Sequence, residues 1–160
     1  MSRERTAAII IASTRAAAGV YRDECAPLLE QWLTVKGYRV QRSAVVPDGE
    51  AVRDAIAQSL DESPSVLITS GGTGLSADDV TPEITEQFLN RSLPGVMEAV
   101  RGAGAAKTPM AALSRGYAGV AGETFIINLP GSPGAVRDGI AVLDPILDHI
   151  CAQLEGNHEH

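Results

Sequence analysis

Apolar and polar residues follow one another in a pattern that predicts strands and helices taking turns along the whole chain. Runs that are apolar on both sides are typical of strands in the buried middle of a parallel sheet. Positions that are apolar every three or four residues predict helices with one buried face. The expected strands cover residues 6–12, 38–46, 65–69 and 124–129. The expected helices cover residues 23–36, 50–60, 81–90, 96–101 and 136–154.

Two prolines and one threonine indicate where helices begin or break. Thr81 can cap the helix that follows it, with Pro82 at the first helical position. Pro145 is expected to interrupt or bend the last helix, because proline cannot donate the backbone hydrogen bond. Residues 102–109 are expected to form a loop, and the pattern over residues 110–114 favours no single element.

The alternation of strands and helices is not broken by a linker or a change in composition. It predicts one α/β domain with a mainly parallel sheet over residues 1–155, followed by a polar tail over residues 156–160. In such sheets, ligands bind beyond the carboxyl ends of the strands. The loops that leave strand ends here cover residues 13–20, 47–49, 70–81 and 130–134.

Composition excludes some classes of function. The chain has 160 residues, of which 44% are hydrophobic and 21% charged, as in an ordinary soluble globular protein. Its net charge of -7 argues against a general nucleic-acid or membrane-surface binder. Because no signal peptide or membrane-spanning run is present, we expect a cytoplasmic protein. Cys25 and Cys151 are expected to be buried thiols and not a disulfide.

The segment after the third expected strand combines glycines with hydroxyl groups. Glycines let the backbone approach a ligand, and successive N–H groups can then bind an anion. The residues expected to bind substrate here are Ser70, Gly71, Gly72, Thr73 and Gly74. A tight turn without a ligand is the alternative. The segment is not a P-loop, because Leu75 stands where a lysine is needed, and its helix begins too late for a dinucleotide fingerprint.

Carboxylates lie on two of the strand-end loops. Asp78 and Asp79 follow the glycines, and Asp48 follows the second expected strand. Carboxylates can bind Mg²⁺ in partnership with substrate phosphates. The alternative for Asp78 and Asp79 is favourable charge at a helix N-terminus. Because Asp48 lies on the same predicted rim, we expect Asp48 and Asp79 to hold one metal between them, as phosphoryl transfer requires.

Hydroxyl, guanidinium and amide groups follow the other strands. An arginine can bind a phosphate through two hydrogen bonds, and a helix N-terminus after residue 132 would attract one. A solvated surface position is the alternative for each arginine. The further candidates are Ser13, Arg15, Ser114, Arg115, Asn128, Pro130, Gly131 and Ser132. No Ser-His-Asp, Cys-His or zinc spacing exists, so transfer by positioning and a metal fits best.

These segments together resemble the MoaB/Mog family of molybdenum-cofactor biosynthesis, which includes the G domain of gephyrin. Gly-Gly-Thr-Gly at residues 71–74 and Asp-Val-Thr-Pro-Glu at residues 79–83 look like its signature. The other matching segments, in the same order, are residues 13–21, 47–48, 113–115 and 127–132. The resemblance implies a three-layer α/β/α fold that assembles as a homotrimer.

The resemblance also implies molybdopterin adenylyltransferase activity. In that reaction, the terminal phosphate of molybdopterin attacks the α-phosphate of Mg-ATP and pyrophosphate is released. The product is then the substrate of a molybdate-insertion enzyme. Carried over by motif, Asp48 and Asp79 would organise Mg²⁺, and residues 71–74 would hold phosphates. Ser13 and Arg15 would lie near the phosphates, whereas Ser114, Arg115 and residues 128–132 would line the pterin side.

Two positions depart from the family pattern. Many relatives have an arginine where this chain has Asp78, and an aspartate where it has Thr14. An anion at residue 78 is expected to weaken triphosphate binding unless its side chain points away. The alternatives to an enzyme are a carrier that binds molybdopterin without catalysing transfer, and a trimeric scaffold that binds other proteins.

Overall fold

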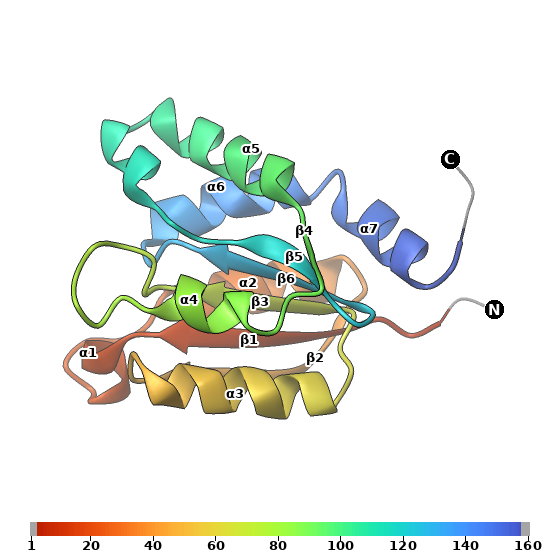
Figure 1. Cartoon of the computed structure of the whole chain (residues 1–160), viewed down its shortest axis with the longest axis horizontal. Coiled ribbons are helices and arrows are strands. Elements are labelled where there is room, and N and C mark those ends of the chain that lie inside the picture. Colours follow the sequence, from red (N-terminus) through yellow and green to blue (C-terminus); the bar gives the residue numbers. More distant parts are fainter. Residues whose placement is uncertain (1–2, 158–160) are drawn as a thin grey trace.

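A six-stranded sheet forms the middle layer of the protein, with helices on both of its faces (Figure 1). The structure is a computed structural model that describes residues 3–157. The order of strands across the sheet is β2-β1-β3-β6-β5-β4. The strands are β1 (Thr6–Ala12), β2 (Arg39–Val46), β3 (Val66–Ser70), β4 (Arg91–Ser92), β5 (Ala118–Ala121) and β6 (Thr124–Leu129).

The helices form the two outer layers. They are α1 (Thr14–Ala17), α2 (Cys25–Val35), α3 (Glu50–Asp61), α4 (Thr81–Glu86), α5 (Pro94–Ala105), α6 (Pro133–Leu143) and α7 (Leu147–Leu154), with a 3-10 helix, η1 (Pro109–Leu113), after α5. Helices α3 and α4 cover one face of the sheet, and α2, α5, α6 and α7 cover the other (Figure 1). The predicted three-layer α/β/α architecture is therefore confirmed.

Strand β1 shows why an uninterrupted apolar run predicted the sheet correctly. Ala7, Ile9 and Ile11 pack into the core under α2 and α6. The alternating residues of the same strand, such as Ala8 and Ile10, pack into the core under α3. Because both faces of the strand are buried, both sets of side chains must be apolar. Strands β2, β1, β3 and β6 pair in parallel, so the sheet is mainly parallel as predicted.

The antiparallel edge of the sheet was not predicted. Strand β5 pairs antiparallel with β6, and the two-residue strand β4 pairs antiparallel with β5. Helix α5 also continues to Ala105, into the first half of the expected loop, and η1 occupies most of the segment for which no element was predicted. Gly104 permits this, because a Cβ there would stand 2.7 Å from the Cβ of Ala111. The close packing of α5 on η1 thus overrides the low helix propensity of glycine.

Two predictions about helix ends had different outcomes. The interruption at Pro145 is confirmed, because α6 ends at Leu143 and α7 begins at Leu147. The cap at Thr81 is wrong: Val80 is the N-cap residue of α4, and within residues 3–157 no group hydrogen-bonds the Thr81 hydroxyl. Helix α4 also ends at Glu86, earlier than expected.

Both cysteines are buried free thiols, as predicted. Among the helices of the described chain, none has the length and apolar character needed to cross a membrane. The expected polar tail lies partly outside the described residues.

The side chain of Asn128 joins the sheet to α4. It is fully buried, and its Nδ2 donates to Thr69 Oγ1 and Thr85 Oγ1, both at 2.9 Å. Its Oδ1 accepts a hydrogen bond of 3.0 Å from the backbone N–H of Tyr117. Strands β3 and β6, helix α4 and the segment before β5 therefore meet at one amide.

Replacing Asn128 with alanine should lower the free energy of unfolding by about 2–4 kcal/mol, because the partners of the amide would stay buried without hydrogen bonds. Urea unfolding followed by circular dichroism measures this change. Asn90 is a matched control, since it also accepts a backbone hydrogen bond, from Gly122, but is exposed. Asn90→Ala should cost under about 1 kcal/mol. Equal losses for the two variants would contradict the role given to Asn128.

Candidate functional site

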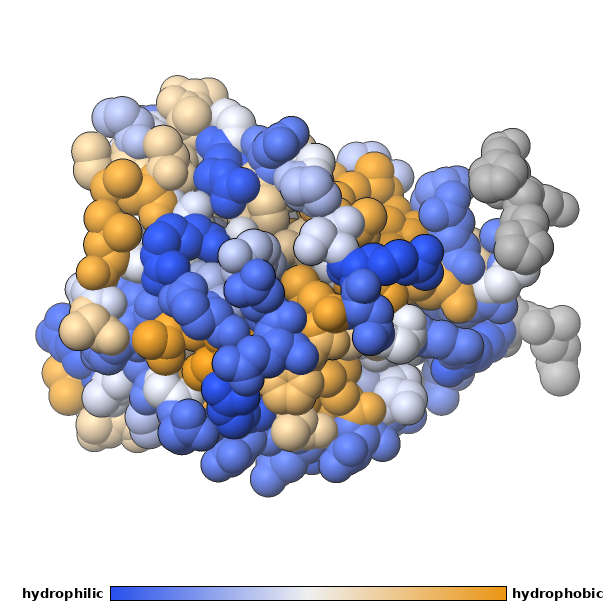
Figure 2. Space-filling view, viewed as in Figure 1, coloured by the Kyte–Doolittle hydropathy of each residue, from blue (hydrophilic) through white to orange (hydrophobic). Residues whose placement is uncertain are grey.

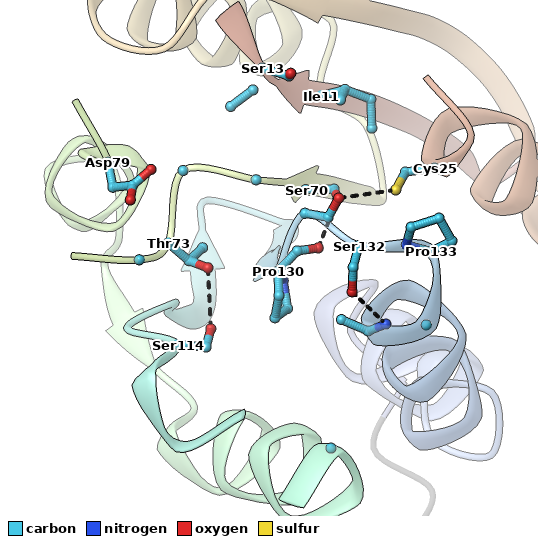
Figure 3. Close-up of a pocket in the computed structure, with 18 of the residues that line it drawn as sticks. Ile11, Ser13, Cys25, Ser70, Thr73, Asp79, Ser114, Pro130, Ser132 and Pro133 are labelled. Atoms are coloured by element: carbon cyan, nitrogen blue, oxygen red, sulfur yellow. Dashed lines mark hydrogen bonds between the residues drawn. The ribbon is translucent and has the colours of Figure 1, made fainter. Parts of the chain in front are cut away.

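A cavity of about 1060 Å³ lies beyond the carboxyl ends of the parallel strands. The loops after β1, β2, β3 and β6 contribute to its lining, and α5, η1 and the start of α6 form one wall. Figure 3 shows side chains from these elements facing a common space. The prediction that functional groups gather at this edge of the sheet is therefore supported by the shape of the molecule.

Gly71 brings three loops together at the centre of the cavity. Its φ is +99°, and a Cβ on it would stand 2.2 Å from the carbonyl oxygen of Ala12. Its N–H donates to the carbonyl of Leu129 at 2.9 Å, and a Cβ on Gly131 would meet its Cα at 3.2 Å. Any side chain at residue 71 would separate the ends of β1, β3 and β6.

Hydroxyl groups fix the loops around this centre. Ser70 Oγ donates to the carbonyl of Pro130 at 2.9 Å, and Ser114 Oγ donates to Thr73 Oγ1 at 3.3 Å (Figure 3). Ser132 caps α6, because its Oγ accepts a hydrogen bond from the N–H of Ala135 at 3.1 Å. The lining of the cavity thus includes the N-terminus of α6, already capped by Ser132, and the Gly-rich segment, residues 70–74.

Most of the predicted site residues line this one cavity. They are Ser13, Arg15, Asp48, Ser70, Gly71, Gly72, Thr73, Gly74, Asp79, Ser114, Pro130, Gly131 and Ser132. Two predicted residues, Arg115 and Asn128, do not line it. Asn128 is the buried link between the sheet and α4, and its amide is fully engaged there.

Arg115 lies outside the cavity lining and binds the loop that follows the glycines. Its guanidinium donates to the carbonyls of Gly74 at 2.9 Å and Asp79 at 2.7 Å, and it forms an ion pair of 2.7 Å with Glu83. The hydrogen bond to Glu83 raises the pKa of Arg115 above its ordinary value, so the side chain stays charged. Arg115 therefore supports the loop beside the cavity, and its expected contact with the pterin stays a prediction.

The two predicted metal carboxylates both face the cavity, each with one oxygen already held. Asp48 Oδ2 accepts hydrogen bonds from the N–H of Thr14 at 3.3 Å and from its Oγ1 at 3.1 Å. Asp79 Oδ2 accepts a hydrogen bond of 3.0 Å from the N–H of Ser76. Each carboxylate therefore has a fixed orientation and a second oxygen available to a ligand. Asp78 also lines the cavity and is exposed, so its charge adds to theirs.

Two carboxylates suit a divalent cation only if a substrate supplies more ligands. Within residues 3–157, no three Asp, Glu, His or Cys side chains come together as a complete metal site. Mg²⁺ typically binds one or two carboxylates plus waters and substrate phosphates. The oxygen donors of Asp48 and Asp79 fit that type of site, and they do not fit a resident metal held by protein alone.

The wall formed by α5 and η1 was not predicted from the sequence. It contributes Arg101 and Lys107 to the cavity, together with the exposed apolar side chains of Met110 and Leu113. Lys107 forms an ion pair with Asp138 on α6. The buried helical spacing of Met97, Val100 and Gly104 is the signal that could have extended α5 to this point.

Tyr21 is a second missed contributor, on the opposite side of the cavity. Its hydroxyl shares a hydrogen bond of 2.7 Å with Ser13 Oγ, and the Arg15 guanidinium lies 5.7 Å from the centre of its ring. The cavity therefore has an aromatic face near the first loop, suited to contact with a planar heterocycle.

Cys25 lies at the cavity but is not an activated nucleophile. Its Sγ donates to the carbonyl of Gly131 at 3.6 Å. Burial raises the pKa of the Cys25 thiol, so the neutral form dominates near pH 7. Cys25 is therefore not a candidate for the nucleophile of a reaction in this cavity.

The model of one protein family, described as a probable molybdopterin binding domain, matches residues 8–149. A molybdenum cofactor biosynthesis bifunctional protein from Synechococcus elongatus is 36% identical over 94% of this chain and 47% of its own length. The chain thus spans about half the length of the curated relatives that it matches first. The molybdopterin adenylyltransferase of Escherichia coli K12 is 33% identical over 81% of this chain and 69% of its own length.

Solved structures show the same fold. The molybdopterin biosynthesis Mog protein from Mycobacterium ulcerans superposes with a TM-score of 0.90 and is 50% identical, covering 94% of this chain and 99% of its own. The molybdopterin biosynthesis enzyme MoaB from Thermus thermophilus superposes with a TM-score of 0.88 at 36% identity, covering 95% of this chain and 97% of its own.

Replacing Gly71 with alanine should lower the free energy of unfolding by about 3 kcal/mol or more, because it combines a strained positive φ with a clash against the backbone of Ala12. Gly95→Ala is the control, since a Cβ on Gly95 meets no atom within 4 Å. That change in a helix should be neutral or stabilise by up to about 1 kcal/mol. Thermal unfolding compares the two, and a Gly71→Ala protein as stable as Gly95→Ala would disprove the steric argument.

Proposed function

The chain belongs to the MoaB/Mog family of molybdenum-cofactor biosynthesis proteins, and we propose that it is a molybdopterin adenylyltransferase. It transfers AMP from Mg-ATP to the terminal phosphate of molybdopterin and releases pyrophosphate. One observation carries the proposal: Asp48 and Asp79, from separate loops, line the same cavity as the Gly-rich segment and the N-terminus of α6. A site that only bound a pterin would not require two carboxylates facing bound phosphates.

The size of the cavity supports a reaction between two substrates. At about 1060 Å³, its volume lies just above the range typical of small-molecule sites, about 300–1,000 Å³. It has two walls of different chemistry, with Tyr21 and Arg15 on one side and Arg101 and Lys107 on the other. A nucleotide and a pterin phosphate can therefore occupy the two sides and meet over the Gly-rich segment.

The protein contributes binding and orientation to this reaction. In this proposal, the backbone N–H groups of residues 72–74 and of Gly134 in the first turn of α6 bind the phosphates. The N–H of Gly71 is bonded to Leu129 and that of Ala135 to Ser132, so neither is available to a ligand. An oxygen of the pterin phosphate forms a bond to the α-phosphorus of ATP, and the bond from that phosphorus to the bridging oxygen breaks. Pyrophosphate leaves with the electron pair. No side chain has to act as a nucleophile, in agreement with the neutral Cys25 thiol.

Mg²⁺, when bound, neutralises negative charge on the triphosphate and on the departing pyrophosphate. Asp48 and Asp79 would hold it through the carboxylate oxygens that the protein leaves available. The amide of Ser76 and the hydroxyl of Thr14 keep these carboxylates oriented before the substrate arrives.

A carrier that binds molybdopterin without catalysis is the second candidate. Asp78 favours it, because a third carboxylate in the cavity opposes binding of a triphosphate.

From the membership of the MoaB/Mog family, we also propose that the chain acts in the cytoplasm as a homotrimer and passes its product to a molybdate-insertion enzyme. Analytical ultracentrifugation tests the trimer.

Asp79→Asn should lower pyrophosphate release from Mg-ATP and molybdopterin by on the order of 100-fold or more, since it removes one metal carboxylate. The asparagine oxygen can still accept the hydrogen bond from Ser76, so the loop and pterin binding should persist. Asp61→Asn, at the end of α3 and outside the cavity lining, is the control and should match wild type.

Pyrophosphate release that is the same in Asp79→Asn and in wild type would contradict the metal role. A wild-type protein that binds molybdopterin but releases no pyrophosphate would contradict adenylyl transfer and support the carrier.

A further inference from the structure

One buried hydroxyl beside the cavity has no partner in the fold. Thr81 is 1% exposed, and its Oγ1 is the single buried side-chain oxygen or nitrogen without a hydrogen bond in the part of the chain that the structure describes. The buried threonines Thr85 and Thr124 do form hydrogen bonds. Leaving a buried hydroxyl unpaired costs free energy, so its presence calls for a physical reason.

The hydroxyl lies next to the predicted metal site. A Cβ on Gly72 would stand 2.3 Å from Thr81 Oγ1 and 3.0 Å from Asp48 Oδ1. Both oxygens therefore lie on the same side of Gly72, on which a glycine leaves space. The N–H of Thr81 also donates to the carbonyl of Gly72 at 3.2 Å, which fixes the threonine backbone at this position.

Asp48 has an acceptor that matches this donor. Its Oδ2 is held by Thr14, whereas no donor in residues 3–157 hydrogen-bonds its Oδ1. Carboxylates that bind a metal are usually oriented by hydrogen bonds from neighbouring groups, and losing such a partner typically weakens metal binding about 10–100-fold. An unpaired donor and an unpaired acceptor thus face the same small space above Gly72.

We propose that Thr81 is a positioning residue for Asp48. Its hydroxyl donates a hydrogen bond to Asp48 Oδ1 when the carboxylate takes up a divalent cation together with a nucleotide. The identity of that cation and nucleotide rests on the function proposed above. Asp48 Oδ1 moves into the space beside Gly72 to form the bond, while Oδ2 stays held by Thr14.

The test compares Thr81→Val, which keeps the shape of the side chain but removes the hydroxyl, with Thr81→Ser, which keeps the hydroxyl. Mn²⁺ binding to the full chain is measured by electron paramagnetic resonance in the presence of a non-hydrolysable ATP analogue. We expect Thr81→Val to raise the Mn²⁺ dissociation constant by roughly 10-fold or more. Thr81→Ser should stay within about 3-fold of wild type, because a hydroxyl is still available to donate.

Thermal unfolding without metal gives a second, independent readout. In EDTA, the Tm of Thr81→Val should equal or exceed that of wild type, because the variant loses an unpaired buried hydroxyl. Thr85→Val is the matched control from the same helix, since its hydroxyl accepts a hydrogen bond from Asn128. Its Tm should fall by roughly 2–8 °C, with Mn²⁺ affinity unchanged.

Three results would overturn the role of Thr81. They are wild-type Mn²⁺ affinity in Thr81→Val, a loss of affinity in Thr81→Ser as large as in Thr81→Val, and a wild type that binds no Mn²⁺ with the analogue. Mn²⁺ binding does not depend on pyrophosphate release, so a wild type that fails to transfer AMP would contradict the proposed activity without affecting the role of Thr81.

Discussion

The site depends on the approach of three backbone segments at Gly71. The ends of β1, β3 and β6 come together there so closely that a single methyl group would meet the carbonyl oxygen of Ala12 at 2.2 Å. This approach places the loop of Asp48, the Gly-rich segment and the cap of α6 around one cavity. The hydrogen bonds of Ser70 and Ser114 then fix loops that the packing has already brought together.

Elements were predicted correctly from the sequence where the pattern of apolar residues along a segment matches the burial of that segment in the fold. Strand β1 is buried on both faces and apolar on both faces, so its place in a parallel sheet could be inferred from its own residues. Strand β5, Ala118–Ala121, carries no comparable run. It pairs antiparallel with β6 across Gly122 and Glu123, and Gly119 lets the carbonyl of Arg91 in β4 approach, with a Cβ position 2.4 Å away. The contact with β4 joins residues far apart in sequence, so no local pattern could indicate that edge of the sheet.

The candidate site follows the same rule. Residues at strand ends were predicted well, because the carboxyl ends of parallel strands share one edge of the sheet. The wall from α5 and η1 was missed, because it depends on the contact between Gly104 and Ala111. Arg115 and Asn128 lie in the expected segments, but only the structure shows that their donors face the protein. A residue type in a motif does not by itself separate binding from support.

The attachment of Arg115 to the Gly-rich segment has a thermodynamic consequence. Its guanidinium bonds the carbonyls of Gly74 and Asp79 and the carboxylate of Glu83, so the protein itself holds the loop from residue 74 to residue 79 at both ends. Flexible glycine-rich loops lose conformational entropy when they close on an anion, and this loss weakens binding. In this protein, the loop loses that conformational entropy when the chain folds. A ligand therefore meets a rigid backbone, and its affinity is not reduced by ordering the loop.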